Sequence, residues 1–191
     1  YLDCPMPIFE KRTEVPVSAD ELFAWHERPG AFERLNPPFD PVEIEERTGG
    51  LEVGARTVMK AKVGPVPQRW IAEHTAYEKG RLFRDEMRSG PFQTWIHTHR
   101  FVPVSANRSV LDDRIEYELP MGALGSLFGG GFAKGKLENV FAYRHALTLA
   151  DFAITANTRQ NIGGAGADVI RVAGYSHGQQ TVTLTGNGGN D

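Results

Sequence analysis

The 191-residue chain lacks the features that mark several broad classes of protein. Its single cysteine, Cys4, excludes an internal disulfide and a multi-cysteine metal site. It has no long run of basic residues and a net charge of −3, which argues against a nucleic-acid partner. No apolar stretch approaches the roughly 18 residues of a membrane span, and residues 1–7 do not resemble a signal peptide. We therefore expect a cytoplasmic protein with no nucleic-acid partner and no integral membrane segment.

What the sequence does contain is an ordinary globular composition, 40% hydrophobic and 24% charged. A chain of this length suits one domain with an appended segment. Composition changes near residue 150, beyond which glycine and asparagine are frequent and large apolar residues are few. We therefore expect one domain over residues 7–150 and a segment of a different kind over residues 151–191.

Hydrophobic periodicity and turn residues predict the elements of the first 150 residues. A strand over Ile8–Val17 is followed by two short helices, Ala19–His26 and Ala31–Leu35, and Ser18 with Glu21 forms a capping box for the first helix. Six further strands follow at hairpin spacing, over Val42–Arg47, Arg56–Val63, Gln68–Tyr77, Leu82–Arg88, Thr94–Val102 and Ser109–Leu119. Because no helix separates them, these strands are expected to form an antiparallel meander.

A long helical segment is expected from about Leu124 to Ala150. Three glycines, Gly129–Gly131, lie inside it and each costs about 1 kcal/mol of helix propensity, so we expect an interruption there and regular helix only from Phe132. This order of elements is that of the α+β helix-grip fold, a seven-stranded curved antiparallel sheet wrapped on a long C-terminal helix. Such a sheet cannot bury its concave face alone, so the helix covers it and leaves a cavity.

Several fragments of the sequence resemble the SRPBCC family, which includes START domains, polyketide cyclases, birch-pollen-type allergens and coenzyme-Q-binding proteins. They are Pro7–Glu10, Pro16–His26, Pro29–Leu35, Gly90–Phe92, Trp95–Phe101 and Asp113–Pro120. The later fragments are similar to a bacterial branch in which the domain stands alone or is joined to a nucleotide-sugar-epimerase-like domain. The resemblance, from Pro7 to about Thr148, implies a START-like fold that binds a small hydrophobic ligand, with catalysis in a minority of members.

Alternation along the strands predicts which side chains face the cavity, since residues two apart share a face. Trp95, His97, His99 and Phe101 share the face expected beneath the terminal helix. The candidates for ligand contact are Met59, Trp70, His74, Phe83, Trp95, His97, His99, Phe101, Tyr117, Phe128 and Phe132, and Tyr143 is a further candidate from the helix. Side chains of these types are also common in an ordinary core.

Two histidines and two aspartates are the candidate polar groups of the cavity. Asp85 and Asp113 each lie on an otherwise apolar strand face, and a buried carboxylate needs a partner. His97, His99 or Arg69 can supply that partner. Because histidine titrates near neutral pH, a histidine–aspartate pair can be a structural ion pair, a polar contact for a ligand, or an acid–base pair.

These observations favour a carrier or sensor of a small hydrophobic ligand such as a lipid, a quinone or a polyketide. The alternative is a cyclase- or hydrolase-like enzyme that uses His97 or His99 with Asp85 or Asp113 as an acid–base pair. A third possibility is an interaction module with a vestigial cavity. No metal or other cofactor is expected, because zinc sites usually need about three or four protein ligands and no spacing here demands them. A buried, hydrogen-bonded histidine–aspartate pair facing an open cavity would favour the enzyme.

The glycine-rich segment contains a string typical of calcium-binding β-rolls. Gly163–Arg171 fits the nonapeptide repeat of that architecture and Gly186–Asp191 is a near match. The two copies begin 23 residues apart, which is not a multiple of nine, so they cannot stack in register. Calcium takes about six to eight oxygen ligands, more than one repeat supplies. We expect a truncated β-roll or a loosely ordered extension without a calcium site.

Overall fold

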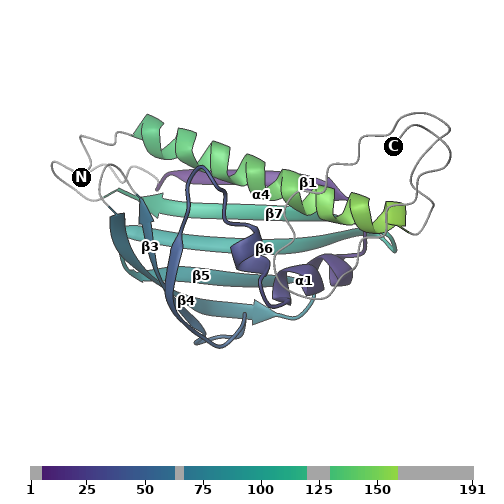
Figure 1. Ribbon diagram of the computed structural model, residues 1–191, viewed down its shortest axis with the longest axis horizontal. Coiled ribbons are helices and arrows are strands. Elements are labelled where there is room, and N and C mark those ends of the chain that lie inside the picture. The colour runs from purple at the N-terminus through teal and green to yellow at the C-terminus, as the bar shows by residue number, and fades with distance from the viewer. Residues whose placement is uncertain (1–5, 63–66, 120–129, 159–191) are drawn as a thin grey trace, which may run out of the picture.

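The computed structural model describes residues 6–62, 67–119 and 130–158 (Figure 1). Its elements are β1 (Ile8–Val15), α1 (Ala19–Glu27), α2 (Ala31–Arg34), β2 (Glu43–Thr48), β3 (Arg56–Lys62), β4 (Pro67–Glu78), β5 (Leu82–Ser89), β6 (Thr94–Ser105), β7 (Arg108–Glu118) and α4 (Gly130–Thr158). The predicted order of strands and helices is therefore confirmed, and the strand ends differ from the predicted ones by three residues or fewer.

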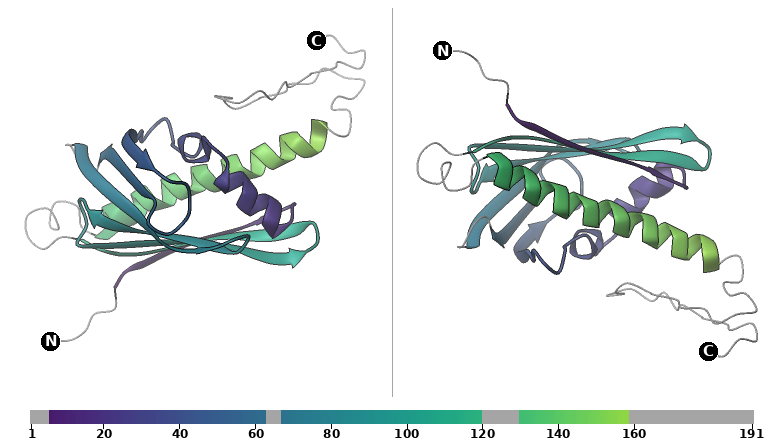
Figure 2. Two further views of the ribbon diagram at one scale, coloured as in Figure 1. Left: turned by 90° about the horizontal axis from the view of Figure 1, so that it is seen from below. Right: turned by 90° about the horizontal axis from the view of Figure 1, so that it is seen from above.

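The seven strands form one antiparallel sheet in the order β1-β7-β6-β5-β4-β3-β2. Strand β1 pairs with β7, with Ile8 opposite Glu116 and Val15 opposite Ser109, so the first strand lies beside the last. The sheet is curved and α4 runs along its concave side (Figure 2). This is the helix-grip arrangement that the sequence predicts.

Helix α1 begins where the sequence predicts because Ser18 and Glu21 form the expected capping box. The Glu21 backbone N–H donates to Ser18 Oγ over 3.2 Å, and the Ser18 N–H donates to Glu21 Oε2 over 3.3 Å. The helix buries Leu22 and Phe23 against the sheet, where the Phe23 ring meets Phe101 on β6 edge to face, with centroids 5.1 Å apart. Helix α1 thereby covers one end of the concave face (Figure 1).

Both ends of α4 differ from the prediction. The described helix begins at Gly130, two residues before the predicted start of regular helix at Phe132, and the earlier part of the prediction, Leu124–Gly129, lies outside the described residues. The predicted end was Ala150, whereas the helix continues to Thr158. A division of the chain at residue 150 therefore cuts this helix instead of following its end.

Contacts with the α1–α2 region explain why α4 continues beyond residue 150. The Asp151 carboxylate forms ion pairs with Arg34 at 2.5 Å and Arg28 at 3.1 Å. The next side chain, Phe152, lies with its ring 6.4 Å from that of Trp25. The change in composition was therefore a wrong guide to the helix end, because these two residues still pack and bond as part of the domain.

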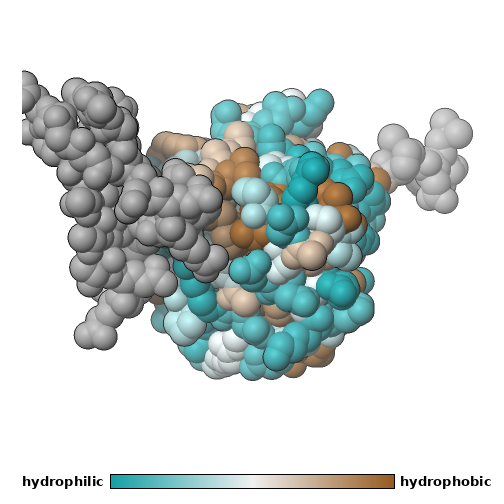
Figure 3. All heavy atoms as spheres, turned by 90° about the vertical axis from the view of Figure 1, so that its right-hand side faces the viewer, coloured by the Kyte–Doolittle hydropathy of each residue, from teal (hydrophilic) through white to brown (hydrophobic). Residues whose placement is uncertain are grey.

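Charged side chains cover the convex face of the sheet. Cross-strand ion pairs join Arg114 to Glu10 at 2.5 Å and Arg88 to Glu73 at 3.2 Å. Exposed pairs of this kind contribute about 0–1 kcal/mol each. Figure 3 shows one end of the molecule, where hydrophilic residues predominate and hydrophobic atoms gather in one band. In the ranges that the structure describes, no helix combines the length and apolar character needed to cross a membrane.

Candidate functional site

A cavity of about 610 Å³ lies between the concave face of the sheet and α4. Strands β3 to β6 form its floor, α4 forms its roof, and the chain around α2 contributes to its sides. Most lining side chains are apolar, among them Met59, Trp70, Phe92, Trp95, Leu137 and Phe141. Small-molecule sites typically have volumes of about 300–1,000 Å³, so the cavity predicted from the order of elements is present and large enough for a ligand.

One end of the cavity is aromatic. Trp70 on β4 and Trp95 on β6 meet edge to face with ring centroids 4.9 Å apart, and Phe92 lies 5.6 Å and 4.9 Å from these two rings. Met59 is opposite Trp70 in the β3–β4 register and also lines the cavity. The buried indole N–H of Trp70 makes no hydrogen bond within the described part of the chain.

The floor also carries a group of imidazoles and carboxylates, here called the histidine–aspartate cluster: Asp85 on β5, His97 and His99 on β6, Asp113 on β7 and His145 on α4. Alternation along β6 places both of its histidines on the concave face, as predicted. The strand register then places Asp85 opposite His97 and Asp113 opposite His99. Four of the five groups are thus brought together by the sheet alone.

Asp113 is the centre of this cluster. Its Oδ1 lies 3.1 Å from His97 Nε2 and 2.6 Å from His99 Nδ1, and its Oδ2 lies 2.8 Å from His145 Nε2. Burial raises the pKa of Asp113, but the nearby His99 and the hydrogen bonds from His145 and His97 outweigh it and hold the pKa well below its ordinary value. Asp113 is therefore an ionised carboxylate surrounded by three imidazoles.

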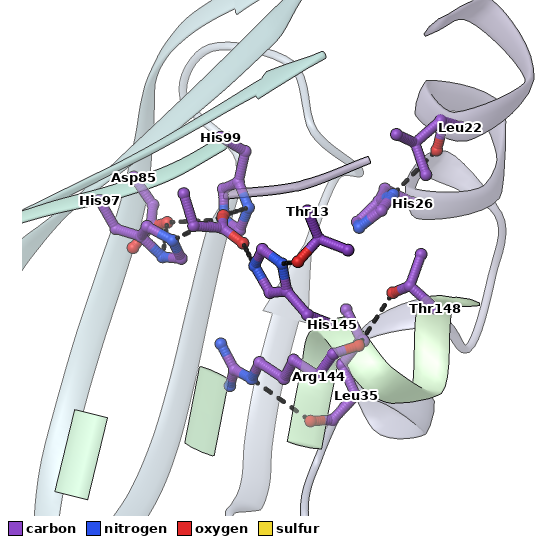
Figure 4. A network of polar contacts seen from close by, with 11 residues as sticks. Thr13, Leu22, His26, Leu35, Asp85, His97, His99, Arg144, His145 and Thr148 are labelled. Carbon is purple, nitrogen blue, oxygen red and sulfur yellow. Dashed lines mark hydrogen bonds and ion pairs between the residues drawn. The ribbon is translucent and has the colours of Figure 1, made fainter. Parts of the chain in front are cut away.

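His145 is a member of the cluster that the sequence analysis missed. It projects from α4 toward β6 and β7, and its Nδ1 lies 2.8 Å from the hydroxyl of Thr13 on β1 (Figure 4). A signal for it was available, because Leu137, Phe141 and His145 are spaced four residues apart and share the buried side of the helix. A polar residue within an apolar helical stripe indicates a buried polar partner, here Asp113.

The histidines that line the cavity are uncharged at neutral pH. His26, at the end of α1, donates from Nδ1 to the Leu22 carbonyl over 2.8 Å, and burial lowers its pKa to about 4. Burial also lowers the pKa of His74, His97 and His99. Each neutral imidazole keeps one ring nitrogen with a lone pair that can accept a proton or a hydrogen bond.

Asp85 lies beside the two histidines of β6 on the cavity wall. Its Oδ2 is 3.5 Å from His97 Nδ1 and 3.9 Å from His99 Nε2, and burial raises its pKa. Arg69, which the sequence analysis offered as a partner for the buried aspartates, pairs instead with Glu45 at 3.0 Å. That expectation was wrong because Arg69 alternates with the cavity-facing positions of β4 and its side chain is on the convex face.

Arg144, the neighbour of His145 on α4, is a partly buried cationic side chain that was also missed. It projects from α4 into the cavity wall, where its Nε donates to the Leu35 carbonyl over 3.3 Å and its guanidinium lies 5.1 Å from the Phe141 ring centroid. Burial lowers its pKa, although nearby carboxylates oppose this effect. Among the described residues, no carboxylate is within ion-pair distance of Arg144, so its outer nitrogens are available to a ligand.

Some of the predicted ligand contacts are not on the cavity wall. Phe101 packs beneath α1 against Phe23, and Tyr117, 4% exposed, belongs to the apolar core beneath α4. Tyr143 packs against Phe39, with ring centroids 5.8 Å apart. Alternation assigns a side chain to a face but not to a place along the strand. Because α1 covers the end of β6, only its part from Trp95 to His99 lies beneath the cavity.

The other predicted contacts lie on the wall, namely Met59, Trp70, His74, Phe83, Trp95 and Phe132. Phe83 stacks on His99, with ring centroids 4.1 Å apart and planes at 25°. Phe132 is 51% exposed at the start of α4, so it lies at the rim of the cavity. Asp113 lies behind the histidines and does not itself line the cavity.

Several candidates fall outside the described residues. They are Phe128, Cys4 and the two glycine-rich strings Gly163–Arg171 and Gly186–Asp191. The string GYSHG at Gly174–Gly178 also lies there, and it matches the serine-nucleophile pattern G-x-S-x-G.

Solved structures share this fold over most of the chain. The ZhuI aromatase/cyclase from Streptomyces sp. R1128 has a TM-score of 0.65 at 14% identity, covering 81% of this chain and 98% of that one. A START superfamily protein from Mycobacterium smegmatis has a TM-score of 0.58 at 13% identity, covering 76% and 97%. The nucleoside-diphosphate sugar epimerase from Corynebacterium glutamicum has a TM-score of 0.57 at 24% identity, covering 79% of this chain but 30% of that one. At these identities the likeness shows the fold alone.

Sequence comparison identifies the family. No match was found among the curated proteins. The family described as polyketide cyclase / dehydrase and lipid transport matches residues 15–142, which run from the end of β1 into α4 and include every cluster residue except His145. This match confirms the resemblance to SRPBCC and START-like proteins, and the chain belongs to the polyketide cyclase / dehydrase and lipid transport family.

Proposed function

We propose that this domain binds a small, mainly apolar molecule in the cavity, with a polar group of that molecule facing the histidine–aspartate cluster. The observation that carries the proposal is the cavity itself, about 610 Å³ in volume and lined mostly by apolar side chains. Because side chains do not fill this space, it argues against the third possibility, an interaction module with a vestigial cavity. A lipid, a quinone or a polyketide has the required combination of a large apolar part and a few oxygens.

The walls provide different contacts for the two parts of such a ligand. Its apolar part would pack against Trp70, Trp95 and Met59, and burial of apolar surface stabilises a complex by about 25 cal/mol per Å². Its oxygen atoms would accept hydrogen bonds from the outer nitrogens of Arg144, whose Nε alone is bonded to the Leu35 carbonyl. The description of the family, which includes lipid transport, is consistent with this role.

Binding can be tested with the fluorescent probe 1-anilinonaphthalene-8-sulfonate and with native mass spectrometry. The mass spectrum of purified protein should contain a co-purifying small molecule, and the stripped protein should bind the probe with a stoichiometry of one. The variant Ala72→Phe places a phenyl ring in the cavity, since Ala72 lines its floor, and should abolish probe binding. Ala142→Phe, on the exposed side of α4, is the matched control. Equal binding by both variants would refute a cavity site.

Acid–base catalysis on the bound molecule is a second candidate function, and one observation favours it. His97 is buried, donates from Nε2 to Asp113, and lines the open cavity. A neutral imidazole held in this way can remove a proton from carbon next to a carbonyl, a step common to cyclisations and dehydrations, and such catalysis contributes about 10²–10⁴-fold. Arg144 would stabilise the negative charge that develops on the carbonyl oxygen.

Proton abstraction can be measured directly with benzoylacetone, an apolar 1,3-diketone that needs no other reactant. Exchange of its methylene protons in D₂O, followed by proton NMR, should be faster with the protein than with buffer alone. His97→Gln should remove the acceleration, whereas His145→Gln, which alters the support of Asp113 but not the cavity wall, should retain part of it. Exchange at the buffer rate in all three samples would leave ligand binding as the function of the domain.

A further inference from the structure

Asp85, His97 and His99 direct three metal-donor atoms toward one point on the cavity floor. The donor atoms of the three residues lie within 4.8 Å of one another. Asp85 Oδ2 is 3.5 Å from His97 Nδ1 and 3.9 Å from His99 Nε2. Donors bound to one ion at about 2.1 Å are separated by about 3.0–3.5 Å. The two distances from Asp85 are close to this range, and the three donor atoms all lie within 4.8 Å of one another, so side-chain rotations can bring them around one ion.

The opposite nitrogens of the two imidazoles lie beside a second carboxylate, to which His97 is hydrogen-bonded. Asp113 Oδ1 lies 3.1 Å from His97 Nε2 and 2.6 Å from His99 Nδ1. An unprotonated nitrogen would be repelled by a carboxylate at these distances, so the ring proton of each neutral histidine is on the Asp113 side. The lone pairs of both rings then face Asp85 (Figure 4). Metal-binding histidines commonly have this second-shell carboxylate, which fixes the tautomer and makes the free nitrogen more basic.

Asp85 Oδ2, His97 Nδ1 and His99 Nε2 meet in one corner of the cavity floor. Unless a proton or a metal ion lies between them, the lone pairs of these three atoms face one another. Burial raises the pKa of Asp85, and among the described residues Arg144 makes no ion pair with this carboxyl group. His26 and His74 also line the cavity and are neutral, and the ammonium of Lys136 is already paired with Asp40 at 2.8 Å. A buried charge without compensation costs several kcal/mol. The corner therefore requires a proton or a metal ion among the three donors.

We propose that Asp85, His97 and His99 bind one divalent transition-metal ion, such as Zn²⁺, on the floor of the cavity. Two imidazole nitrogens and one carboxylate oxygen suit these ions, whereas Ca²⁺ and Mg²⁺ prefer oxygen ligands. Three protein ligands leave at least one coordination position open, as in catalytic zinc sites. Because all three residues line the cavity, that position faces the bound molecule and can take one of its oxygens.

The sequence did not predict this site because its donors come from two strands. His97 and His99 are adjacent on one face of β6, but Asp85 joins them only through the register of β5 with β6. The spacing of twelve residues between Asp85 and His97 corresponds to no metal-binding motif. The strand register therefore supplies the third ligand that the spacing along the chain did not reveal.

Metal binding can be tested by calorimetric titration of Zn²⁺ into the full chain, prepared without a histidine tag and stripped with a chelator. We expect one ion per chain with a Kd of about 10 µM or tighter. Asp85→Asn and His99→Gln should each weaken binding by about tenfold or more. Asp112→Asn is the matched control, because Asp112 pairs with Arg12 at 3.9 Å and does not line the cavity, and this variant should bind Zn²⁺ as the unaltered protein does. Circular dichroism checks that each variant is folded.

Cobalt provides a second measurement that reports on the ligands themselves. Co²⁺ bound to imidazole and carboxylate in a low-coordinate site has strong visible absorption, which should be present with Asp112→Asn and absent with His99→Gln. Binding weaker than about 10 µM, or tight binding that neither donor variant changes, would show that a proton occupies this corner and overturn the proposal. The titrations use ligand-free protein, so either of these results would leave the proposed binding of an apolar molecule untouched.

Discussion

His145 on α4 donates a 2.8 Å hydrogen bond from Nε2 to Oδ2 of Asp113 on β7, and both residues are buried, each 2% exposed. The helix that roofs the cavity is thus joined to the sheet by one charge-assisted contact. Such bonds are about twice as strong as neutral ones. This contact holds α4 close to the sheet at one end of the cavity. The space for a ligand therefore lies at the other end, beside Trp70 and Trp95.

Asp113→Asn should be strongly destabilising. The amide carries no charge, and its NH₂ group cannot accept hydrogen bonds from the imidazoles that surround Asp113. Removing one partner of a buried charged network typically costs about 3–5 kcal/mol. We expect a decrease of this size in the free energy of unfolding, measured with urea, and a fall in Tm of roughly 10 °C.

Asp112→Asn is the neighbouring control, because Asp112 pairs at 3.9 Å with the exposed Arg12. This substitution should lower the free energy of unfolding by less than about 1 kcal/mol. Similar losses in the two variants would contradict the central role of Asp113.

His26 should make the stability of the protein depend on pH below neutrality. Its pKa is lowered by burial from 6.5 to about 4, so the unfolded chain binds a proton between these values and the folded chain does not. The stabilisation from neutral His26 is therefore complete above pH 6.5 and is lost as the pH falls toward 4. Between pH 7 and pH 5 the loss should amount to about 2 kcal/mol.

The measurement compares the unaltered protein with His26→Gln by urea unfolding at both pH values, in the presence of a chelator. Lowered pKa values of His74, His97 and His99 act in the same direction, so the difference between the two proteins isolates His26. The variant should lose about 2 kcal/mol less than the unaltered protein over this interval. Parallel pH curves would show that His26 is protonated in the folded state.

The last turns of α4 should contribute measurably to stability. Phe152→Ala removes a partly buried ring that packs against Trp25, and should cost about 2 kcal/mol. Asp151→Asn removes the ion pairs with Arg28 and Arg34 and should cost about 1 kcal/mol. Ala153→Ser, on the exposed side of the same turn, should change the free energy of unfolding by less than about 0.5 kcal/mol. If all three variants unfold alike, the domain does end near residue 150.

Arg144 should favour ligands with an anionic oxygen. Cis-parinaric acid and its methyl ester are fluorescent probes that differ only in this charge, and the stripped protein should bind the acid more tightly. Arg144→Met should reduce this preference by roughly tenfold or more, because a hydrogen bond to a charged group contributes about 1.5–3 kcal/mol. Arg100→Met, an exposed position on β6, should leave the preference unchanged. Equal affinity of the unaltered protein for acid and ester would exclude this role.

The fold could be predicted because the local signals in the sequence agree with one another. The Ser18–Glu21 capping box, the turn residues between the strands and the alternation along β6 each act within a few residues, so no distant contact decides them. The residue at which α4 ends could not be predicted from local signals. It depends on Asp151 and Phe152 meeting Arg34 and Trp25, which are distant in the chain, and composition alone does not reveal such contacts.

The site was predictable in part for the same reason. Alternation placed His97 and His99 on the concave face, but it did not show that α1 would cover Phe101 and leave the histidines open to the cavity. Nor did it show that Asp113 would be shared with His145 from α4. Both outcomes depend on how the two helices sit on the sheet, which is decided by packing between elements.

The pairing of β1 with β7 has a consequence for how the chain folds as it is synthesised. Strand β1 leaves the ribosome first, but its partner residues Ser109 to Glu116 emerge about a hundred residues later. At about 5–20 residues per second, β1 would remain unpaired for several seconds or longer while the β2–β6 meander can already form. Non-local pairing of this kind slows folding and leaves a strand edge exposed to other chains. Conditions that slow translation should therefore increase aggregation of the nascent protein. The exposed edge is covered once β7 has been synthesised and pairs with β1.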